Sequence, residues 1–107
     1  MLHAIWEFRV RPGREADFEA RYGPEGDWVR LFRRGEGYGG TALLRDPAVR
    51  GRYVVIDVWR DAEAYRAFKE AFAAAYAALD EQCASLTEDE RRLGEFESVS
   101  PVRPEIV

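Results

Sequence analysis

The chain has 107 residues, which is enough for one compact domain and too few for two. Its 16 basic and 20 acidic residues give a formal net charge of −4, so a nucleic-acid-binding protein would need a local basic patch. The single cysteine excludes an internal disulfide and a multi-thiolate metal site. The single histidine excludes a histidine-rich metal site.

The same features favour a cytoplasmic protein without a membrane partner. The first residues alternate in polarity and do not form a charged-then-apolar leader. The longest apolar run, residues 71–79, is much shorter than the roughly 20 residues that span a bilayer. Cys83 has no histidine on its own segment, and we interpret it as a small buried residue.

The first third of the sequence predicts a strand followed by an interrupted helical layer. Polarity alternates with a period of two over Leu2–Val10, which is typical of a strand. A proline-glycine turn at 12–13 follows, and Phe18 and Tyr22 then share one helical face. A second helical segment begins after the glycine-proline break at 23–24. Its apolar residues at helical spacing are Trp28, Leu31 and Phe32.

The middle of the chain predicts a hairpin and a long helix. Two strands, over Tyr38–Arg45 and 52–60, are separated by a turn that contains proline and glycine. Asp61 is an expected N-cap for the helix that follows. Apolar residues then recur at intervals of three and four: Tyr65, Phe68, Phe72, Ala75, Tyr76 and Leu79.

The last part predicts a short helix and a final strand. Thr87 and Glu90 fit the capping-box pattern of a helix that would end near Gly94. Alternation over residues 96–99 then predicts a strand, and prolines mark the tail. The order strand, helix, strand, strand, helix, strand predicts an α+β, ferredoxin-like split βαβ fold. We expect a four-stranded antiparallel sheet with helices on one face, as one domain over 1–100 with a tail at 101–107.

The two faces of the sheet can be assigned from the alternation. Val54, Ile56 and Val58 form a purely apolar set, which we assign to the helix side. Tyr53, Val55, Asp57 and Trp59 are then assigned to the outer side. On the first strand we assign Ala4, Trp6, Phe8 and Val10 to the helix side and His3, Ile5, Glu7 and Arg9 to the outer side. An outer face with Ile5, Tyr53, Val55 and Trp59 is too apolar to face water, which predicts a homodimer through sheet-to-sheet packing.

Two motifs that suggest anionic ligands are weak here. Residues 35–40 match GxGxxG, yet a helix precedes them and a strand follows, which is the reverse of a dinucleotide-binding loop. The arginines at 30, 33, 34, 45, 50 and 52 fit a solvated surface, and no RNA-recognition signature accompanies them. We therefore expect no nucleic-acid partner.

Acid-base candidates are few. His3 has an ordinary pKa near neutrality and is a candidate general base, although a lone histidine near a terminus is more often a surface or interface residue. Glu7 and Asp57 are predicted on one face of neighbouring strands, where two carboxyls could raise one pKa. Each could instead form an ion pair with Arg9 or Arg60.

The sequence is rich in large aromatic residues, which suit both a core and a cavity for a flat apolar ligand. Three segments, VRPGR at 10–14, EGYGGTALLR at 36–45 and YVVIDVWRDAEAY at 53–65, then resemble the antibiotic biosynthesis monooxygenase family of dimeric α/β barrels. The resemblance extends over residues 2–99. It implies the fold and a dimer, and, for activity, oxygenation without metal or flavin, so that no cofactor is expected.

The haem-degrading branch of that family is disfavoured by particular residues. It uses an asparagine on the first strand and a tryptophan and a histidine on the long helix. Those positions fall near Trp6, Phe68, and Tyr76 or Ala78, and the chain contains no asparagine.

The resemblance therefore implies a cofactor-independent monooxygenase that acts on a small aromatic, phenol-like or quinol-like substrate. An ionised phenol or enol would give an electron to dioxygen. The base would be His3 or Asp57, although neither is predicted to face the cavity. The expected substrate contacts are Trp6, Trp28, Tyr38, Phe68 and Phe72. The alternative is a non-catalytic homodimer that binds a small apolar ligand.

Overall fold

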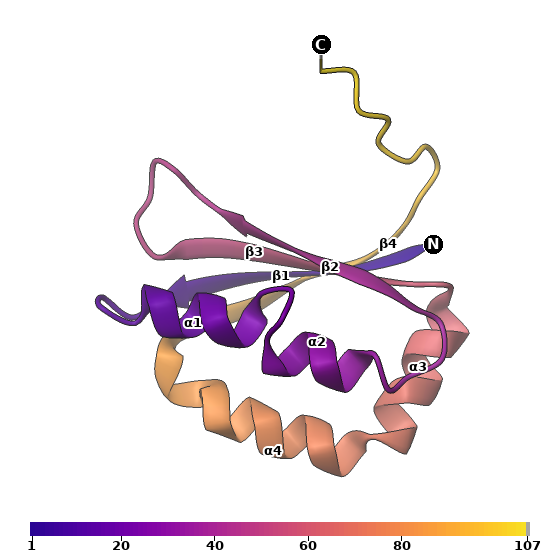
Figure 1. Cartoon of the computed structure of the whole chain (residues 1–107), viewed down its shortest axis with the longest axis horizontal. Coiled ribbons are helices and arrows are strands. Elements are labelled where there is room, and N and C mark those ends of the chain that lie inside the picture. The colour runs from indigo at the N-terminus through magenta and orange to yellow at the C-terminus, as the bar shows by residue number, and fades with distance from the viewer. Residues whose placement is uncertain (107) are drawn as a thin grey trace.

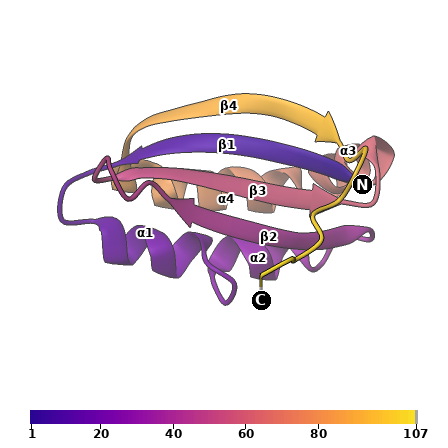
Figure 2. The same cartoon turned by 90° about the horizontal axis from the view of Figure 1, so that it is seen from above.

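An antiparallel sheet forms one layer of the molecule (Figure 1). The computed structural model describes residues 1–106, and within them the sheet has four strands in the order β2-β3-β1-β4 (Figure 2). This arrangement confirms the predicted ferredoxin-like fold. The strands are β1 (Leu2–Val10), β2 (Tyr38–Arg45), β3 (Arg52–Trp59) and β4 (Thr87–Glu97).

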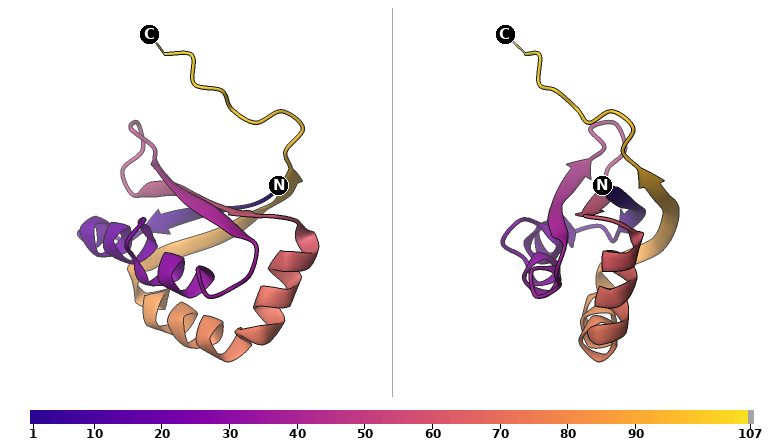
Figure 3. Two further views of the ribbon diagram at one scale, coloured as in Figure 1. Left: turned by 45° about the vertical axis from the view of Figure 1, so that its right-hand side comes forward. Right: turned by 90° about the vertical axis from the view of Figure 1, so that its right-hand side faces the viewer.

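All the helices lie on one face of this sheet, in two arms (Figure 3). The first arm lies below the β2 side and the second below the β4 side, with space between them that side chains fill. No described helix is long and apolar enough to cross a membrane. The first arm comprises α1 (Glu15–Tyr22) and α2 (Asp27–Phe32), and the second comprises α3 (Ala62–Ala71) and α4 (Ala73–Cys83), followed by a 3-10 turn (Ala84–Leu86).

The predicted long helix is divided at Phe72. The cap at its start is as predicted, because the Asp61 side chain accepts a hydrogen bond of 2.8 Å from the backbone N–H of Ala64. Phe72 leaves helical geometry, with φ −114° and ψ 25°, so α3 and α4 run in different directions (Figure 1). This break allows α4 to run below the sheet, whereas α3 descends from its edge.

The predicted short helix over residues 87–94 is wrong. These residues belong to β4, which pairs antiparallel with β1 from Val10↔Thr87 to Leu2↔Glu97. The capping-box pattern is a local preference, and pairing with a buried neighbouring strand satisfies far more backbone groups. Because β4 is an exposed and mostly charged edge strand, it carries no hydrophobic alternation that would have revealed it.

The face assignment of β3 is also wrong, while that of β1 is correct. Tyr53, Val55 and Trp59 are buried on the helix side, and Val54, Ile56 and Val58 are half-buried on the outer side. The register explains the correction, because paired residues of antiparallel strands share a face. Helix-side residues of β1 pair with this set: Ala4↔Asp57, Trp6↔Val55 and Phe8↔Tyr53. Both faces of β3 are largely apolar, so alternation alone could not distinguish them.

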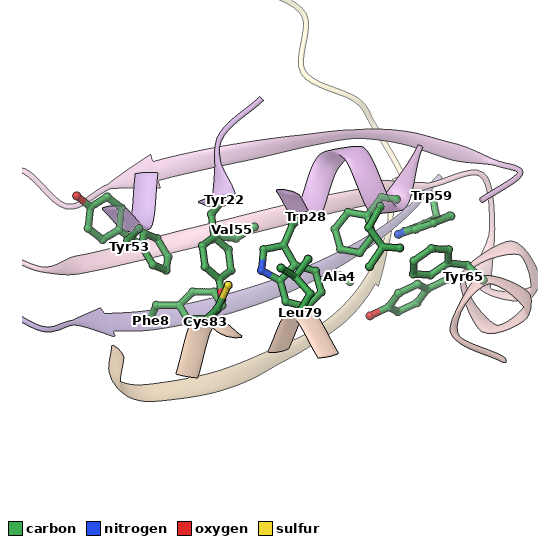
Figure 4. Close-up of a cluster of buried hydrophobic side chains, with 14 of the residues drawn as sticks. Ala4, Phe8, Tyr22, Trp28, Tyr53, Val55, Trp59, Tyr65, Leu79 and Cys83 are labelled. Atoms are coloured by element: carbon green, nitrogen blue, oxygen red, sulfur yellow. The ribbon is translucent and has the colours of Figure 1, made fainter. Parts of the chain in front are cut away.

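Aromatic side chains from the sheet and both arms form the core (Figure 4). At one end Trp59 packs against Tyr65, Phe32 and Phe68, with ring centroids 5.6, 5.8 and 4.9 Å away. At the other end Phe18 stacks on Tyr22 at 4.2 Å. Edge and offset contacts of this kind stabilise a core beyond the area that they bury.

The glycine-rich segment 35–40 is a helix-to-strand turn, as its context predicted. Gly37 has φ +90°, and a Cβ atom there would lie 2.8 Å from the Cβ of Ala64. Glycine is therefore required both for the backbone conformation and for the close approach of α3.

Candidate functional site

A narrow cavity lies between the sheet and the two helical arms. Its walls come from every strand and from α1, α2 and α4, so it sits at the centre of the fold. The space is about 380 Å³ including its mouth, of which about 30 Å³ can hold the centre of a water molecule, room for one or two waters. The lining residues are Trp6, Phe8, Tyr22, Trp28, Phe32, Thr41, Val55, Asp57, Tyr76, Asp80 and Glu90.

Asp57 is the deepest acidic group of this cavity, with 6% of the residue exposed. Its side chain accepts a hydrogen bond of 2.8 Å from the Thr41 hydroxyl, and no basic group of the described residues lies within 4.0 Å of it. Burial raises the pKa of Asp57 to about 6, and the hydrogen bond from Thr41 opposes this rise. A carboxyl of this kind can exchange a proton near neutral pH.

A hydrogen-bonded chain leads from Asp57 on β3 to Tyr38 at the start of β2. The hydroxyls of Thr41 and Tyr38 are 2.6 Å apart. Tyr38 and Thr41 also line a second, open depression beside α2, on the solvent side of β2. This chain fixes one oxygen of Asp57, and the other has no hydrogen-bond partner within residues 1–106.

Two further carboxyls, Asp80 on α4 and Glu90 on β4, line the cavity. Burial raises the pKa of Glu90, and the nearby charge of Asp80 adds to the rise. Burial also raises the pKa of Tyr22, whose hydroxyl stays protonated at neutral pH. The cavity therefore combines aromatic walls with acidic groups and has no cation among its lining residues.

Trp28 supplies an unpaired donor. Only 6% of this residue is exposed, and its indole Nε1 has no hydrogen-bond partner among the described residues. The ring lies between Tyr22 and Tyr76, at 5.9 and 4.9 Å between centroids (Figure 4 shows Trp28 and Tyr22). The Tyr22 hydroxyl and the Cys83 thiol are its nearest polar neighbours, although neither forms a hydrogen bond of normal geometry with it.

The structure brings together only part of the predicted site. Trp6 and Trp28 line the cavity, and Tyr38 is joined to it through Thr41. Phe68 is a core residue packed on Trp59, and Phe72 stacks on Phe68 at 5.3 Å; neither lines the cavity.

Both candidate bases have defined positions. His3 pairs with Val58 on the outer face, where its Nδ1 lies 3.4 Å from the Ser98 hydroxyl. Asp57 was assigned to the same outer face as Glu7, and this is wrong: Asp57 lies in the cavity, while Glu7 is on the opposite side and binds Arg52 and Arg91.

Three lining residues that the sequence reasoning missed carry chemistry: Thr41, Asp80 and Glu90. Thr41 pairs with Asp57 because Arg45 pairs with Tyr53, whereas counting outward from the predicted strand ends would have placed Ile56 opposite Thr41. Glu90 was hidden by the incorrect helix prediction for its segment. Asp80 was hidden because the break at Phe72 changes the direction of α4.

The model of the antibiotic biosynthesis monooxygenase family matches residues 1–77. The chain belongs to this family. No curated protein matches it. Solved structures of other proteins have the same fold, as three comparisons illustrate.

SnoaB from Streptomyces nogalater, a cofactor-independent oxygenase, is 21% identical over 96% of this chain and 97% of its own, with a TM-score of 0.76. A Bordetella bronchiseptica protein described as a candidate antibiotic biosynthesis monooxygenase is 25% identical over 92% of this chain and 97% of its own, with a TM-score of 0.75. A MhuD variant with two manganese protoporphyrin IX molecules bound per active site is 25% identical over 97% of this chain and 100% of its own, with a TM-score of 0.75.

Proposed function

We propose that this protein is a cofactor-independent monooxygenase that oxidises a small aromatic substrate bearing an ionisable hydroxyl. The observation that carries the proposal is the position of Asp57, a buried carboxyl with a pKa of about 6 at the wall of an aromatic cavity. The family supports oxygenase chemistry, and the cavity supports a flat ligand.

In this proposal Asp57 accepts the proton of the substrate hydroxyl. The resulting anion is electron-rich and reduces dioxygen, which forms a bond to a ring carbon as a peroxide. Loss of water then converts the ring C–H into C=O. One oxygen atom of dioxygen remains in the product and the other leaves as water, and the substrate itself supplies the electrons. The aromatic walls exclude bulk water from this reaction.

The pKa of the base restricts the substrate. A simple phenol has a pKa near 10, so a base with a pKa of about 6 would ionise it only to roughly one part in ten thousand. We therefore expect a hydroxyl that is more acidic than phenol, such as an enol or a ring hydroxyl conjugated to a carbonyl group.

The structure leaves little free room inside the cavity. Room for one or two waters does not admit an aromatic ring, so the side chains that line the mouth must move when the substrate enters. Trp6 and Tyr76 are half-buried and lie between the cavity and the surface, and they are the residues that we expect to move.

A homodimer through the outer face of the sheet is part of the proposal. Half-buried Ile5, Ile56 and Val58 lie on this face, and at its edges Leu44 is 50% and Phe96 52% exposed. A continuous apolar strip of this kind favours association of two sheets. The strip differs from the predicted one. From β3 it contains Val54, Ile56 and Val58, and it does not contain Tyr53, Val55 and Trp59.

The test is oxygen consumption with a series of aromatic compounds whose hydroxyl is enolic or conjugated to a carbonyl group, measured with the wild type and with D57N, and with a simple hydroxynaphthalene as the weakly acidic comparison. The matched control is E81Q, which removes one exposed negative charge from α4. We expect D57N to lower kcat/KM by about a hundredfold or more and E81Q to leave it unchanged. Equal activity of D57N and the wild type would remove Asp57 as the base.

The non-catalytic alternative gives a different result. A ligand-binding protein would show saturable quenching of tryptophan fluorescence by the same compounds, with no oxygen uptake. Titration with haem tests whether the protein is a haem-binding protein. Because the one histidine, His3, lies outside the cavity, we expect no spectrum of a histidine-ligated haem.

A further inference from the structure

An open groove lies next to the cavity and shares two of its walls. It has a volume of about 720 Å³ including its mouth, of which about 410 Å³ can hold the centre of a water molecule, and it lies between β1, β4 and the junction of α3 and α4. Trp6 and Tyr76 line both spaces, so the groove is the approach to the cavity. The lining residues are Trp6, Tyr65, Lys69, Ala73, Tyr76 and Arg92.

The groove is basic, whereas the cavity behind it is acidic. Lys69, the only lysine of the chain, projects over the ring of Tyr65, with its Nζ 4.0 Å from the ring centroid. None of the described carboxylates lies within 4.0 Å of this ammonium. Lys69 is an exposed residue, and partial burial of its ammonium together with the nearby guanidinium of Arg92 lowers its pKa.

Arg92 completes the pair of cations. It lies on the helix-facing side of β4, where it pairs with Trp6 in the ladder, and it forms an ion pair with Glu95 on the same strand. Among the described residues, Glu95 is thus the one carboxylate within 4.0 Å of either cation that lines the groove, and it pairs with Arg92. An added anion would find an uncompensated charge there.

The opposite is true inside the cavity. Asp57 and the more exposed Asp80 and Glu90 would repel a permanently charged anionic group that entered it, whereas transfer of a proton from the substrate hydroxyl to Asp57 leaves the number of negative charges in the cavity unchanged. An anionic aromatic molecule is thus favoured in one orientation, with its charge at the mouth and its ring towards Asp57.

We infer that the groove at Lys69 and Arg92 binds an anionic substituent of the substrate, a carboxylate or a group of similar charge, while the hydroxylated ring enters between Trp6 and Tyr76. The substrate class is then an aromatic hydroxy acid whose acidic group lies at the end of the ring system opposite the reacting hydroxyl. This inference rests on the proposed function, because the bound molecule is a substrate only if the protein is an oxygenase. Binding of the molecule in this orientation can be tested without turnover.

The experiment is calorimetric titration without dioxygen, so that no turnover occurs. The probes are a hydroxynaphthoate whose hydroxyl and carboxylate lie at opposite ends of the rings, and its methyl ester, which has nearly the same shape and no charge. We expect the wild type to bind the acid about tenfold or more tightly than the ester, and added salt to reduce this difference.

Three variants locate the effect. We expect K69Q and R92Q each to weaken binding of the acid by about fivefold and to leave binding of the ester unchanged, as for a partly exposed ion pair. K69R should keep the preference because it keeps the charge. The matched control is R66Q, which removes a cation from the same helix outside the groove, where Arg66 pairs with Glu70.

A second measurement does not depend on variants. Because Lys69 is the only lysine, methylation with a carbon-13 label gives one side-chain signal besides that of the amino terminus. Binding of the acid should raise the pKa reported by that signal, since a nearby anion favours the charged form.

Equal binding of acid and ester, binding of neither, or an R66Q effect as large as that of K69Q would overturn the inference. Oxygen uptake is measured separately on the same samples. Preferential binding of the acid with no uptake of oxygen by any substrate would contradict the proposed function and leave the anion site standing.

Discussion

The cost of burying Asp57 gives a quantitative prediction for D57N. The pKa of this carboxyl rises from its ordinary value of 3.8 to about 6 in the folded protein. Each pKa unit corresponds to about 1.4 kcal/mol, so the ionised carboxylate lowers the free energy of unfolding by about 3 kcal/mol relative to the protonated form. Because only 6% of Asp57 is exposed, solvent screens its charge little, and the change in pKa can be converted into a free energy in this way.

The sign follows from the direction of that pKa. The folded protein binds the proton more tightly than the unfolded chain, so this group adds stability as the pH falls from above about 6 towards 3.8. About 2 kcal/mol of the total should appear between about pH 8 and about pH 4. An asparagine keeps the acceptor for Thr41 and has no such dependence.

The assay is urea unfolding of the wild type, D57N and E81Q at several pH values. We expect D57N to be most stabilised relative to the wild type at about pH 8, and this advantage to shrink by about 2 kcal/mol at about pH 4. E81Q should follow the wild type throughout. A constant difference between D57N and the wild type over this range would refute the reasoning, because it would show that Asp57 has an ordinary pKa.

Other predictions concern separate parts of the molecule. The pH profile of kcat/KM should rise through about 6, and T41V should move this rise to higher pH, because the Thr41 hydrogen bond lowers the pKa of the base. E7Q should lower the melting temperature at neutral pH, since Arg52 and Arg91 hold the pKa of Glu7 below its ordinary value; this loss should disappear as the pH falls through that lowered pKa. I56D should convert a dimer into a monomer in light scattering, while V102D, in the exposed tail, should not. F68L should reduce stability by about 1–2 kcal/mol and leave the affinity for a hydroxynaphthalene unchanged, because Phe68 belongs to the core.

Much of the fold follows from short-range patterns in the sequence. The period of two over β1 reflects the alternation of side chains between the two faces of a strand. The Asp61 cap reflects a hydrogen bond between residues three positions apart. The β4 segment shows the limit of this reasoning. Its strand depends on pairing with β1, a contact between residues about eighty positions apart, and its own charged residues favour no single structure.

The site was only partly accessible for a related reason. Trp6 and Trp28 were expected in the cavity, but the role of Asp57 depended on the face to which β3 was assigned. The apolar character of Val54, Ile56 and Val58 led to the wrong face being assigned to the helices, because the outer face of the sheet is apolar as well. The register with β1 gives the right one, since Ala4 is fully buried on the helix side and pairs with Asp57. With that correction, the base and the aromatic cavity no longer lie on opposite faces.

The most direct test of the account is a crystal structure of D57N grown with a hydroxynaphthalene in the absence of dioxygen. We expect the ring in the cavity between Trp6, Trp28 and Tyr76, its hydroxyl within hydrogen-bond distance of residue 57, and a second copy of the chain on the outer face of the sheet. A cavity that remains filled by protein side chains, with the ligand bound elsewhere or absent, would contradict the claim that this cavity is an oxygenase site.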